Sequence, residues 1–131
     1  MKEVLELLNK IGTYYLATAD GNLPHVRPIG FVMEHDGKLA FCTSNEKNMY
    51  KQMQANPSIE ISGFDGSQIL RITGVVEFIT SEDTQRKALE VMPALSGMYA
   101  VGDGKFEIFR LASGKATSAV MATNEVKEWA L

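Results

Sequence analysis

The stretch HVRPIGFVMEHDGKLAFCTSNEKN, residues 25–48, decides the fold predicted for this chain. Asp36-Gly37 lies between two apolar runs, and an Asp-Gly pair in that place is the strongest short-range signal of a β-hairpin. The pattern predicts a strand over about 25–34, a tight turn, and a second strand that ends near residue 42. Because a hairpin brings its two ends together, we expect Arg27 to lie near the polar loop that follows the second strand.

That polar loop is TSNEKN, residues 43–48, and it precedes a predicted helix. Ser44 or Asn45 can cap this helix, and the free N–H groups of a helix N-terminus attract anions. Lys47 adds a full positive charge, and Arg27 would add a guanidinium fork that suits phosphate. The residues therefore indicate a phosphate site. An ordinary capped helix with a solvated lysine is the alternative interpretation.

The rest of the chain is predicted to form short strands and a few helices. The predicted helices cover 2–11, 45 or 46 to about 55, and 82–92, and the further strands cover 13–19, 58–64, 68–79, 105–112 and 116–122, with a turn at Gly114. The tail 124–131 is predicted to be an amphipathic patch that contains Trp129. Because the strands cluster around turns, a mainly antiparallel sheet of six or seven strands is favoured, and closing it into a small barrel would remove exposed edges.

Length and composition limit the classes of protein to consider. The 131 residues predict a single domain, 1–131, and a formal net charge of −3 argues against a nucleic-acid-binding surface. The N-terminus lacks the apolar core of a signal peptide, and no apolar run is long enough to cross a membrane. The single cysteine, Cys42, cannot form an internal disulfide, so we expect a reducing compartment and a cytoplasmic protein.

Several common kinds of catalytic site are not indicated by the sequence. One cysteine and two histidines, His25 and His35, do not show the spacing of metal ligands, so no metal is expected. Cys42 lies in the apolar run LAFC, where a cysteine usually behaves as a small buried hydrophobe. The chain has no G-x-S-x-G elbow, no Walker loop and no dinucleotide-binding glycine motif. No residue is identified as a catalytic acid, base or nucleophile.

The order HVRPIGFV, DGKLAFCTSNEKN, helix and NPSIEISG resembles the pyridoxamine 5′-phosphate oxidase-like FMN-binding split-barrel proteins. The resemblance covers about residues 3–121. It implies a mainly β fold, a six-stranded antiparallel split β-barrel of Greek-key type with about three peripheral helices. It also implies a homodimer with FMN at the subunit interface.

The resemblance further implies which residues bind the cofactor. The backbone from Arg27 to Val32 would lie along the flavin ring, and the loop after the second strand would bind the phosphate. The partner subunit would contribute from the later part of its chain, where Gln68, Arg71 and Trp129 are candidates. Trp129 could equally be a structural anchor of the tail. The residues assigned to the cofactor are Arg27, Pro28, Ile29, Gly30, Cys42, Thr43, Ser44, Lys47, Asn48 and Trp129.

Two departures from the family pattern narrow the implied activity. The oxidases place a lysine for the substrate phosphate where this chain has Val32, and their C-terminal motif with Arg and Trp is missing here. The chain therefore resembles the small flavin reductases and general-stress-type members, and an FMN-dependent oxidoreductase acting on an unidentified small molecule is expected. The alternatives are a non-enzymatic flavin-binding sensor or electron carrier, or a relative that binds deazaflavin or haem, the haem through His25 or His35.

Overall fold

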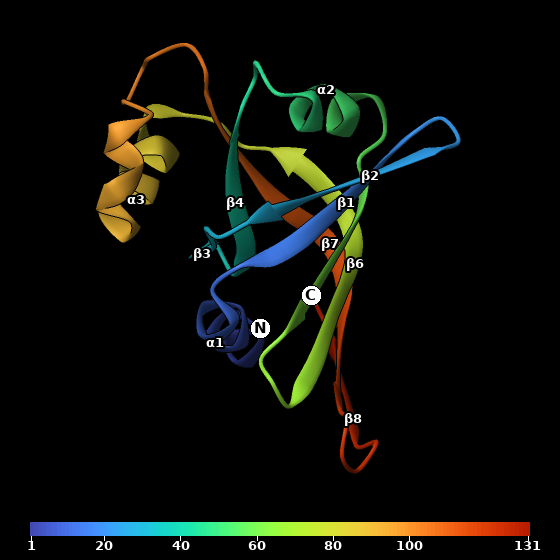
Figure 1. The fold of residues 1–131 in the computed structure, drawn as a ribbon. Helices are drawn as coiled ribbons and strands as arrows, with labels where there is room; N and C mark the ends of the chain where they lie inside the picture. Colours follow the sequence, from blue (N-terminus) through green and yellow to red (C-terminus); the bar gives the residue numbers. More distant parts are fainter.

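Eight strands of one antiparallel sheet dominate the computed structural model, which describes residues 1–131 (Figure 1). The strands run in the order β2-β1-β5-β6-β7-β4-β3, and β8 pairs with β7. Strands β2 and β3 are consecutive in the chain but lie at the two ends of this order, so the barrel is not closed. The prediction of a mainly β split barrel is confirmed, with eight strands in place of six. The strands are β1 (Tyr14–Asp20), β2 (Leu23–Ile29), β3 (Met33–His35), β4 (Lys38–Ser44), β5 (Ser58–Phe64), β6 (Gln68–Phe78), β7 (Phe106–Val120) and β8 (Val126–Ala130).

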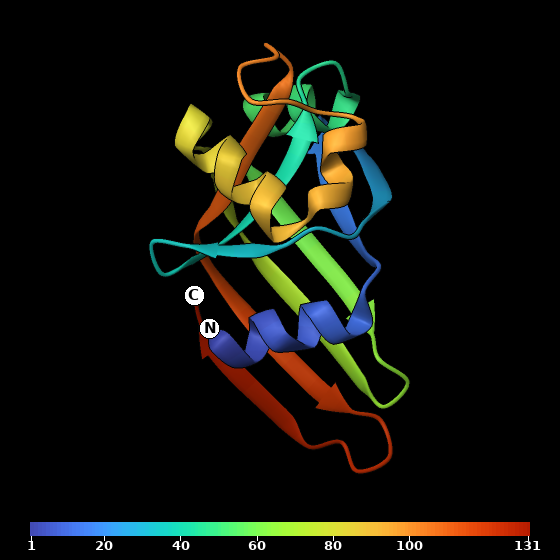
Figure 2. The same cartoon turned by 90° about the vertical axis from the view of Figure 1, so that its left-hand side faces the viewer.

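Three α-helices lie around the sheet, as the sequence predicts. They are α1 (Lys2–Ile11), α2 (Asn48–Ala55) and α3 (Glu82–Val91), and a short 3₁₀ helix, η1 (Pro93–Gly97), follows α3. None of these helices is long and apolar enough to span a membrane. Figure 1 places α2 over one end of the sheet and α1 near the other, and Figure 2 shows α1 lying across β5, β6 and β7.

Two clusters of buried side chains form the core. The larger one is enclosed by the sheet, α1 and α2, and includes Leu16, Phe41, Ile61, Ile72 and Phe109. Strands β1 and β5 alternate buried and more exposed residues, which is the pattern of a sheet with one face turned to the core. The smaller cluster lies under α3 and η1, where the rings of Tyr99 and Phe106 stack with centroids 4.5 Å apart.

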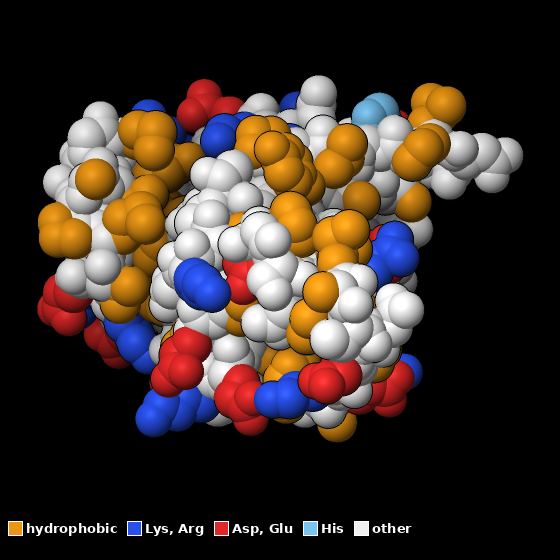
Figure 3. All heavy atoms as spheres, turned by 60° about the horizontal axis from the view of Figure 1, so that its bottom comes forward, with side chains coloured by type: hydrophobic (Ala, Val, Ile, Leu, Met, Phe, Trp, Pro, Cys, Tyr) orange, Lys and Arg blue, Asp and Glu red, His pale blue; other side chains and the backbone are white.

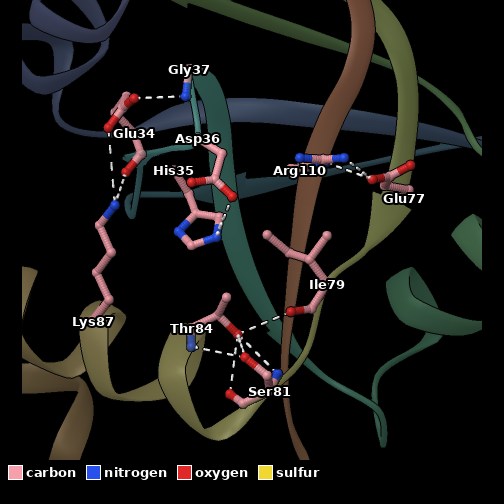
Figure 4. Close-up of polar contacts among 10 residues, drawn as sticks. All are labelled: Glu34, His35, Asp36, Gly37, Glu77, Ile79, Ser81, Thr84, Lys87 and Arg110. Carbon is pink, nitrogen blue, oxygen red and sulfur yellow. Dashed lines mark hydrogen bonds and ion pairs between the residues drawn. The ribbon is translucent and has the colours of Figure 1, made fainter.

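Polar contacts fix α3 against the rest of the fold (Figure 4). Ser81 caps α3 by accepting from the Thr84 backbone N–H at 3.1 Å, and the Thr84 hydroxyl accepts from the Ser81 N–H at 2.9 Å. Near the other end of α3, the Lys87 ammonium donates to the carbonyl oxygen of Glu34. The helix is therefore tied to β3, one of the two ends of the sheet.

The prediction of one strand over 25–34 is wrong. Strand β2 ends at Ile29, and β3 begins only at Met33. The chain leaves the sheet at Gly30, where an added Cβ would lie 3.2 Å from the carbonyl oxygen of Gly12, and it then turns inward. Phe31 is buried, and its carbonyl accepts from the Tyr14 hydroxyl at 2.8 Å. Consequently only β3 and β4 form the predicted hairpin, and β2 pairs with β1 instead.

The prediction of two strands separated by a turn at Gly114 is also wrong. Strand β7 runs unbroken from Phe106 to Val120, and Gly114 lies opposite Gly74 of β6. A Cβ at Gly74 would lie 2.4 Å from the carbonyl oxygen of Ser113, and one at Gly114 would lie 2.6 Å from that of Thr73. These glycines allow two backbones to approach closely, and the register shifts between Val75 and Val76 beside them.

The C-terminal tail is a strand, which its charge pattern did not indicate. Strand β8 adds to the sheet with Ala116 opposite Trp129, and the Trp129 side chain packs against the larger core cluster. Figure 2 shows β8 ending beside the start of α1. Within its own chain, Trp129 therefore anchors the tail, which is one of the two roles that the sequence allowed.

Candidate functional site

A hollow of about 330 Å³ lies between β2, at one end of the sheet, and β4, the strand next to the other end, and we call it the β2–β4 hollow. Strand β2 forms one wall, the end of β4 forms the other, and the start of α2 closes one side. It gathers seven of the ten residues assigned to the cofactor and one that the sequence missed, Met49. Its lining residues are Arg27, Pro28, Ile29, Cys42, Thr43, Lys47, Asn48 and Met49.

Arg27 enters the hollow from β2 and is held by neutral groups. Its Nη1 donates to the Thr18 hydroxyl at 2.8 Å and to the Leu16 carbonyl at 3.4 Å. Its Nη2 donates to Oε1 of Gln52 at 2.8 Å, and the Thr18 hydroxyl donates to the same oxygen at 2.6 Å. Since a guanidinium carries five N–H donors, about two remain free for another acceptor.

The charge of Arg27 has no counter-charge within the chain. The other arginines, Arg71, Arg86 and Arg110, each pair with a carboxylate, whereas Arg27 pairs with none. Partial burial lowers the pKa of the Arg27 guanidinium, but an arginine stays protonated in proteins. A half-buried cation with spare donors and no carboxylate favours an anionic ligand.

Thr43 and Cys42 form the opposite wall. The Thr43 side chain is only 2% exposed, and its hydroxyl has no hydrogen-bond partner in the chain. A buried hydroxyl without a partner costs about 1–3 kcal/mol, so a ligand that accepts from it would recover this cost. Burial raises the pKa of the Cys42 thiol to about 12, with nearby Lys47 lowering it less strongly. Cys42 is therefore a neutral thiol at neutral pH and a poor nucleophile.

The start of α2 completes the hollow, although not with the predicted cap. The N-cap residue is Lys47, and no side chain caps the helix. Ser44 instead accepts from the Glu46 backbone N–H at 3.2 Å, and Asn45 donates to the Gly104 carbonyl at 2.8 Å. The prediction that Ser44 or Asn45 caps α2 is thus wrong, because both side chains brace the loop. The first N–H groups of α2 keep their partial positive charge for a ligand.

Three of the ten assigned residues lie outside the hollow of their own chain. Gly30 faces Gly12, the Ser44 hydroxyl is occupied within its turn, and Trp129 lines a separate hollow beside α1. Gln68 lines that same hollow, and Arg71 lies at the surface, 3.9 Å from Glu60. Val32, the position of the substrate lysine in the oxidases, is buried in the core at 4% exposure.

Two residues that sequence reasoning missed position the guanidinium. Thr18 is buried at an inward position of β1, and Gln52 lies one helical turn after Asn48 on α2. Asn48, the last residue of the polar loop, and Gln52 are spaced i, i+4 and therefore share one side of α2. The Thr18 contact depends on the pairing of β1 with β2, whereas the sequence predicted that the strand over 25–34 pairs with the strand after Asp36-Gly37. No group of three His, Cys, Asp or Glu side chains lies together where a metal could bind.

A comparison with models of known protein families shows which family the chain belongs to. A family model described as pyridoxamine 5′-phosphate oxidase matches residues 1–126, nearly the whole length. The chain belongs to this family. This is the family that the order of segments in residues 25–63 resembles, so the family predicted from the sequence is confirmed. No curated protein matches the chain by sequence.

Several solved structures are similar to this chain in fold, and one of them is also similar in sequence. A NimC/NimA family protein from Clostridium acetobutylicum is 39% identical, with a TM-score of 0.96 over 100% of this chain and 92% of its own. A family-related FMN-binding protein from Nostoc punctiforme is 14% identical, with a TM-score of 0.61 over 99% and 95% of the two chains. A heme-binding protein from Mycobacterium smegmatis is 15% identical, with a TM-score of 0.73 over 94% and 56%. The last two show the shared fold alone.

Proposed function

We propose that the β2–β4 hollow binds FMN and that its 5′-phosphate lies among Arg27, Thr43 and the start of α2. The observation that carries this proposal is the Arg27 guanidinium, which is half-buried, has spare donors and lacks a carboxylate partner. Thr43 would donate its unpartnered hydroxyl, and Lys47 would add an exposed positive charge. The likeness in fold to an FMN-binding relative supports the same ligand.

The proposed activity is that of an oxidoreductase acting on an unidentified small molecule. FMN would supply the hydride or electron transfer when bound. The chain would bind and orient it, and the neutral Cys42 thiol and apolar Ile29 and Met49 would shield one side from water. No side chain of the hollow is placed as a catalytic acid or base. A flavin-binding sensor or electron carrier without turnover is the alternative, and the lone cysteine fits a reducing cytoplasm for both.

We further propose a homodimer with FMN at its interface. Large apolar side chains remain exposed on the outward face of the sheet and on the β1–β2 hairpin that projects in Figure 3. Tyr15, Phe64, Ile69 and Met121 surround a shallow hollow of about 360 Å³ there. An exposed apolar patch of this kind marks an interaction surface. Phe64→Glu is expected to convert a dimer to a monomer in light scattering, and a wild-type monomer would contradict the dimer.

The direct test of flavin binding is the visible spectrum of the purified protein. A flavin absorption band, or quenching of FMN fluorescence when micromolar FMN is added to colourless protein, is expected. If the protein is colourless and quenches no FMN, the proposal fails. Consumption of a nicotinamide nucleotide by the loaded protein would then separate the oxidoreductase from the non-enzymatic module.

Haem is the second candidate ligand, favoured by one histidine and one relative. Nε2 of His25 is buried without a hydrogen-bond partner, and a relative of this fold is named as heme-binding. The hollow beside His25 is mostly polar, however, which suits a porphyrin poorly. A Soret band that disappears in His25→Ala would favour haem over FMN, and a flavin spectrum alone would exclude it.

A further inference from the structure

A second and larger hollow, of about 640 Å³, adjoins the first on the far side of Arg27. We call it the β1–α2 hollow, because the β1–β2 hairpin forms one wall and α2 forms the other. Figure 1 shows the hairpin projecting beside α2. Its size falls within the range of small-molecule sites. Its lining residues are Ala19, Asp20, Gly21, His25, Asn48, Lys51, Gln52, Ala55 and Asn56.

One face of α2 is polar and turned toward this hollow. Asn48, Lys51, Gln52 and Ala55 are spaced i, i+3, i+4 and i+7, so they share one side of the helix, while Met49 and Met53 occupy the core side. This division leaves amides and an ammonium facing a hollow that contains only two apolar residues. Such a lining suits a polar ligand that offers many acceptors and donors.

Two of these groups lack partners within the chain. Lys51 is exposed and pairs with no carboxylate, in contrast to Lys10, Lys87, Lys115 and Lys127. On the opposite wall, Nε2 of His25 is buried and has no hydrogen-bond partner. An ammonium and an imidazole facing each other across a hollow favour an anionic ligand between them.

The two hollows share a wall at the phosphate end of the proposed flavin site. Asn48 lines both hollows. Arg27 of the first donates to Oε1 of Gln52 in the second at 2.8 Å. The β1–α2 hollow is therefore the neighbouring hollow into which a ligand with its phosphate beside Arg27 and Asn48 can extend.

We propose that the β1–α2 hollow is a second subsite, which receives the outer phosphate and the purine nucleoside of a flavin dinucleotide. This inference rests on the proposed flavin function of the β2–β4 hollow. Lys51 and His25 bind the second phosphate, and the side-chain amides of Asn48 and Asn56 bind the purine edge. The Asp20 carboxylate accepts from the ribose hydroxyls, which is the usual role of an acidic residue beside a nucleotide ribose.

The test is a competition on FMN-loaded protein. The protein is incubated with equal excesses of free FMN and FAD and passed through gel filtration, and the bound flavins are released and separated by chromatography. Wild-type protein is expected to retain FAD at least as well as FMN. Lys51→Gln and His25→Ala are each expected to lower the bound FAD:FMN ratio about 5- to 10-fold, the effect of losing one ordinary hydrogen bond. Lys51 is exposed, so its variant keeps the fold.

Matched controls separate a local effect from a general one. Lys2→Gln removes another exposed, unpaired lysine on α1, and His35→Ala removes the other histidine with a buried, unpartnered nitrogen. Both are expected to leave the FAD:FMN ratio unchanged. Retention of FMN with exclusion of FAD would overturn the second subsite and leave the flavin proposal standing. If AMP binds tightly to FMN-loaded protein, the β1–α2 hollow receives a separate nucleotide, and the proposal of a flavin dinucleotide is overturned. Retention of no flavin would overturn both proposals.

Discussion

Replacing Arg27 and Lys47 by alanine should weaken the binding of FMN much more than that of riboflavin, which lacks the phosphate. The structure gives the two residues unequal weight. Arg27 is half-buried with about two spare donors, so its loss should cost about 2–3 kcal/mol, a roughly 30- to 150-fold rise in Kd. Lys47 is exposed and screened by water, so its loss should cost about 0.5–1 kcal/mol, or roughly 2- to 5-fold.

The assay is fluorescence quenching of FMN and of riboflavin, titrated in parallel at fixed ionic strength. The double variant should raise the Kd for FMN about 100-fold, with incomplete additivity because both residues contact one phosphate, and should change riboflavin about 3-fold at most. Arg71→Ala is the control, since it removes a surface arginine that pairs with Glu60. Arg27→Lys should recover only part of the affinity, because an ammonium lacks the guanidinium fork.

Stability must be followed in the same variants. Arg27→Ala also removes hydrogen bonds to Thr18 and Gln52 and should lower the free energy of unfolding by about 1–2 kcal/mol, whereas Lys47→Ala should leave it unchanged. Urea denaturation of each variant therefore shows whether the lost binding arises from unfolding. Equal weakening of FMN and riboflavin by the folded Lys47→Ala and double variants would refute the assignment of the phosphate.

Three further predictions concern support of the site and of the fold. Thr18→Val leaves Nη1 of Arg27 with only its longer contact, 3.4 Å to the Leu16 carbonyl, so it should lower stability by about 1–2 kcal/mol and weaken the binding of FMN but not of riboflavin; unchanged FMN affinity would contradict the positioning role. Gly74→Ala places a Cβ 2.4 Å from the Ser113 carbonyl and should destabilise by about 2–3 kcal/mol in urea denaturation, whereas Gly97→Ala meets nothing within 4 Å and should be nearly neutral. Hydrogen bonds from the backbone N–H groups of Gln68 and, less strongly, Ser67 lower the pKa of Asp65 to about 2. The stability that the ionised Asp65 carboxylate gives to the fold is therefore complete above about pH 4 and is lost as the pH falls toward 2. Asp65→Asn should flatten the pH dependence of the urea midpoint in that window relative to Glu90→Gln, and an unaltered dependence would exclude Asp65 as its source.

Local signals in the sequence were sufficient for most elements. The i, i+3, i+4, i+7 spacing predicted α1 at its observed bounds, and the Asp-Gly pair at 36–37 predicted the β3–β4 turn. Cys42, Thr43, Lys47 and Asn48 line one hollow because the end of β4, the polar loop and the start of α2 are adjacent in the chain. These features depend on neighbours in sequence, which a pattern can report.

The errors occurred where distant segments decide the structure. Gly114 has the composition of a turn, but it continues β7 because Gly74 of a neighbouring strand approaches it closely. The tail is polar in composition, yet β7 offers it a free edge and it becomes β8. Arg27 reaches the polar loop from the opposite end of the sheet, and not through a shared hairpin, so Thr18 and Gln52 could not be foreseen as its partners.

The opening between β2 and β4 makes the site a seam of the barrel. No ladder of backbone hydrogen bonds joins β2 to β4, and residues 30–32 connect β2 only to β3, which in turn pairs with β4. A ligand held by Arg27 on one margin and Thr43 on the other would serve as the missing lateral connection. Ligand binding and barrel closure would then be a single event, so the ligand would stabilise the whole chain by RT ln(1 + [L]/Kd) and slow amide exchange first in β2 and α2.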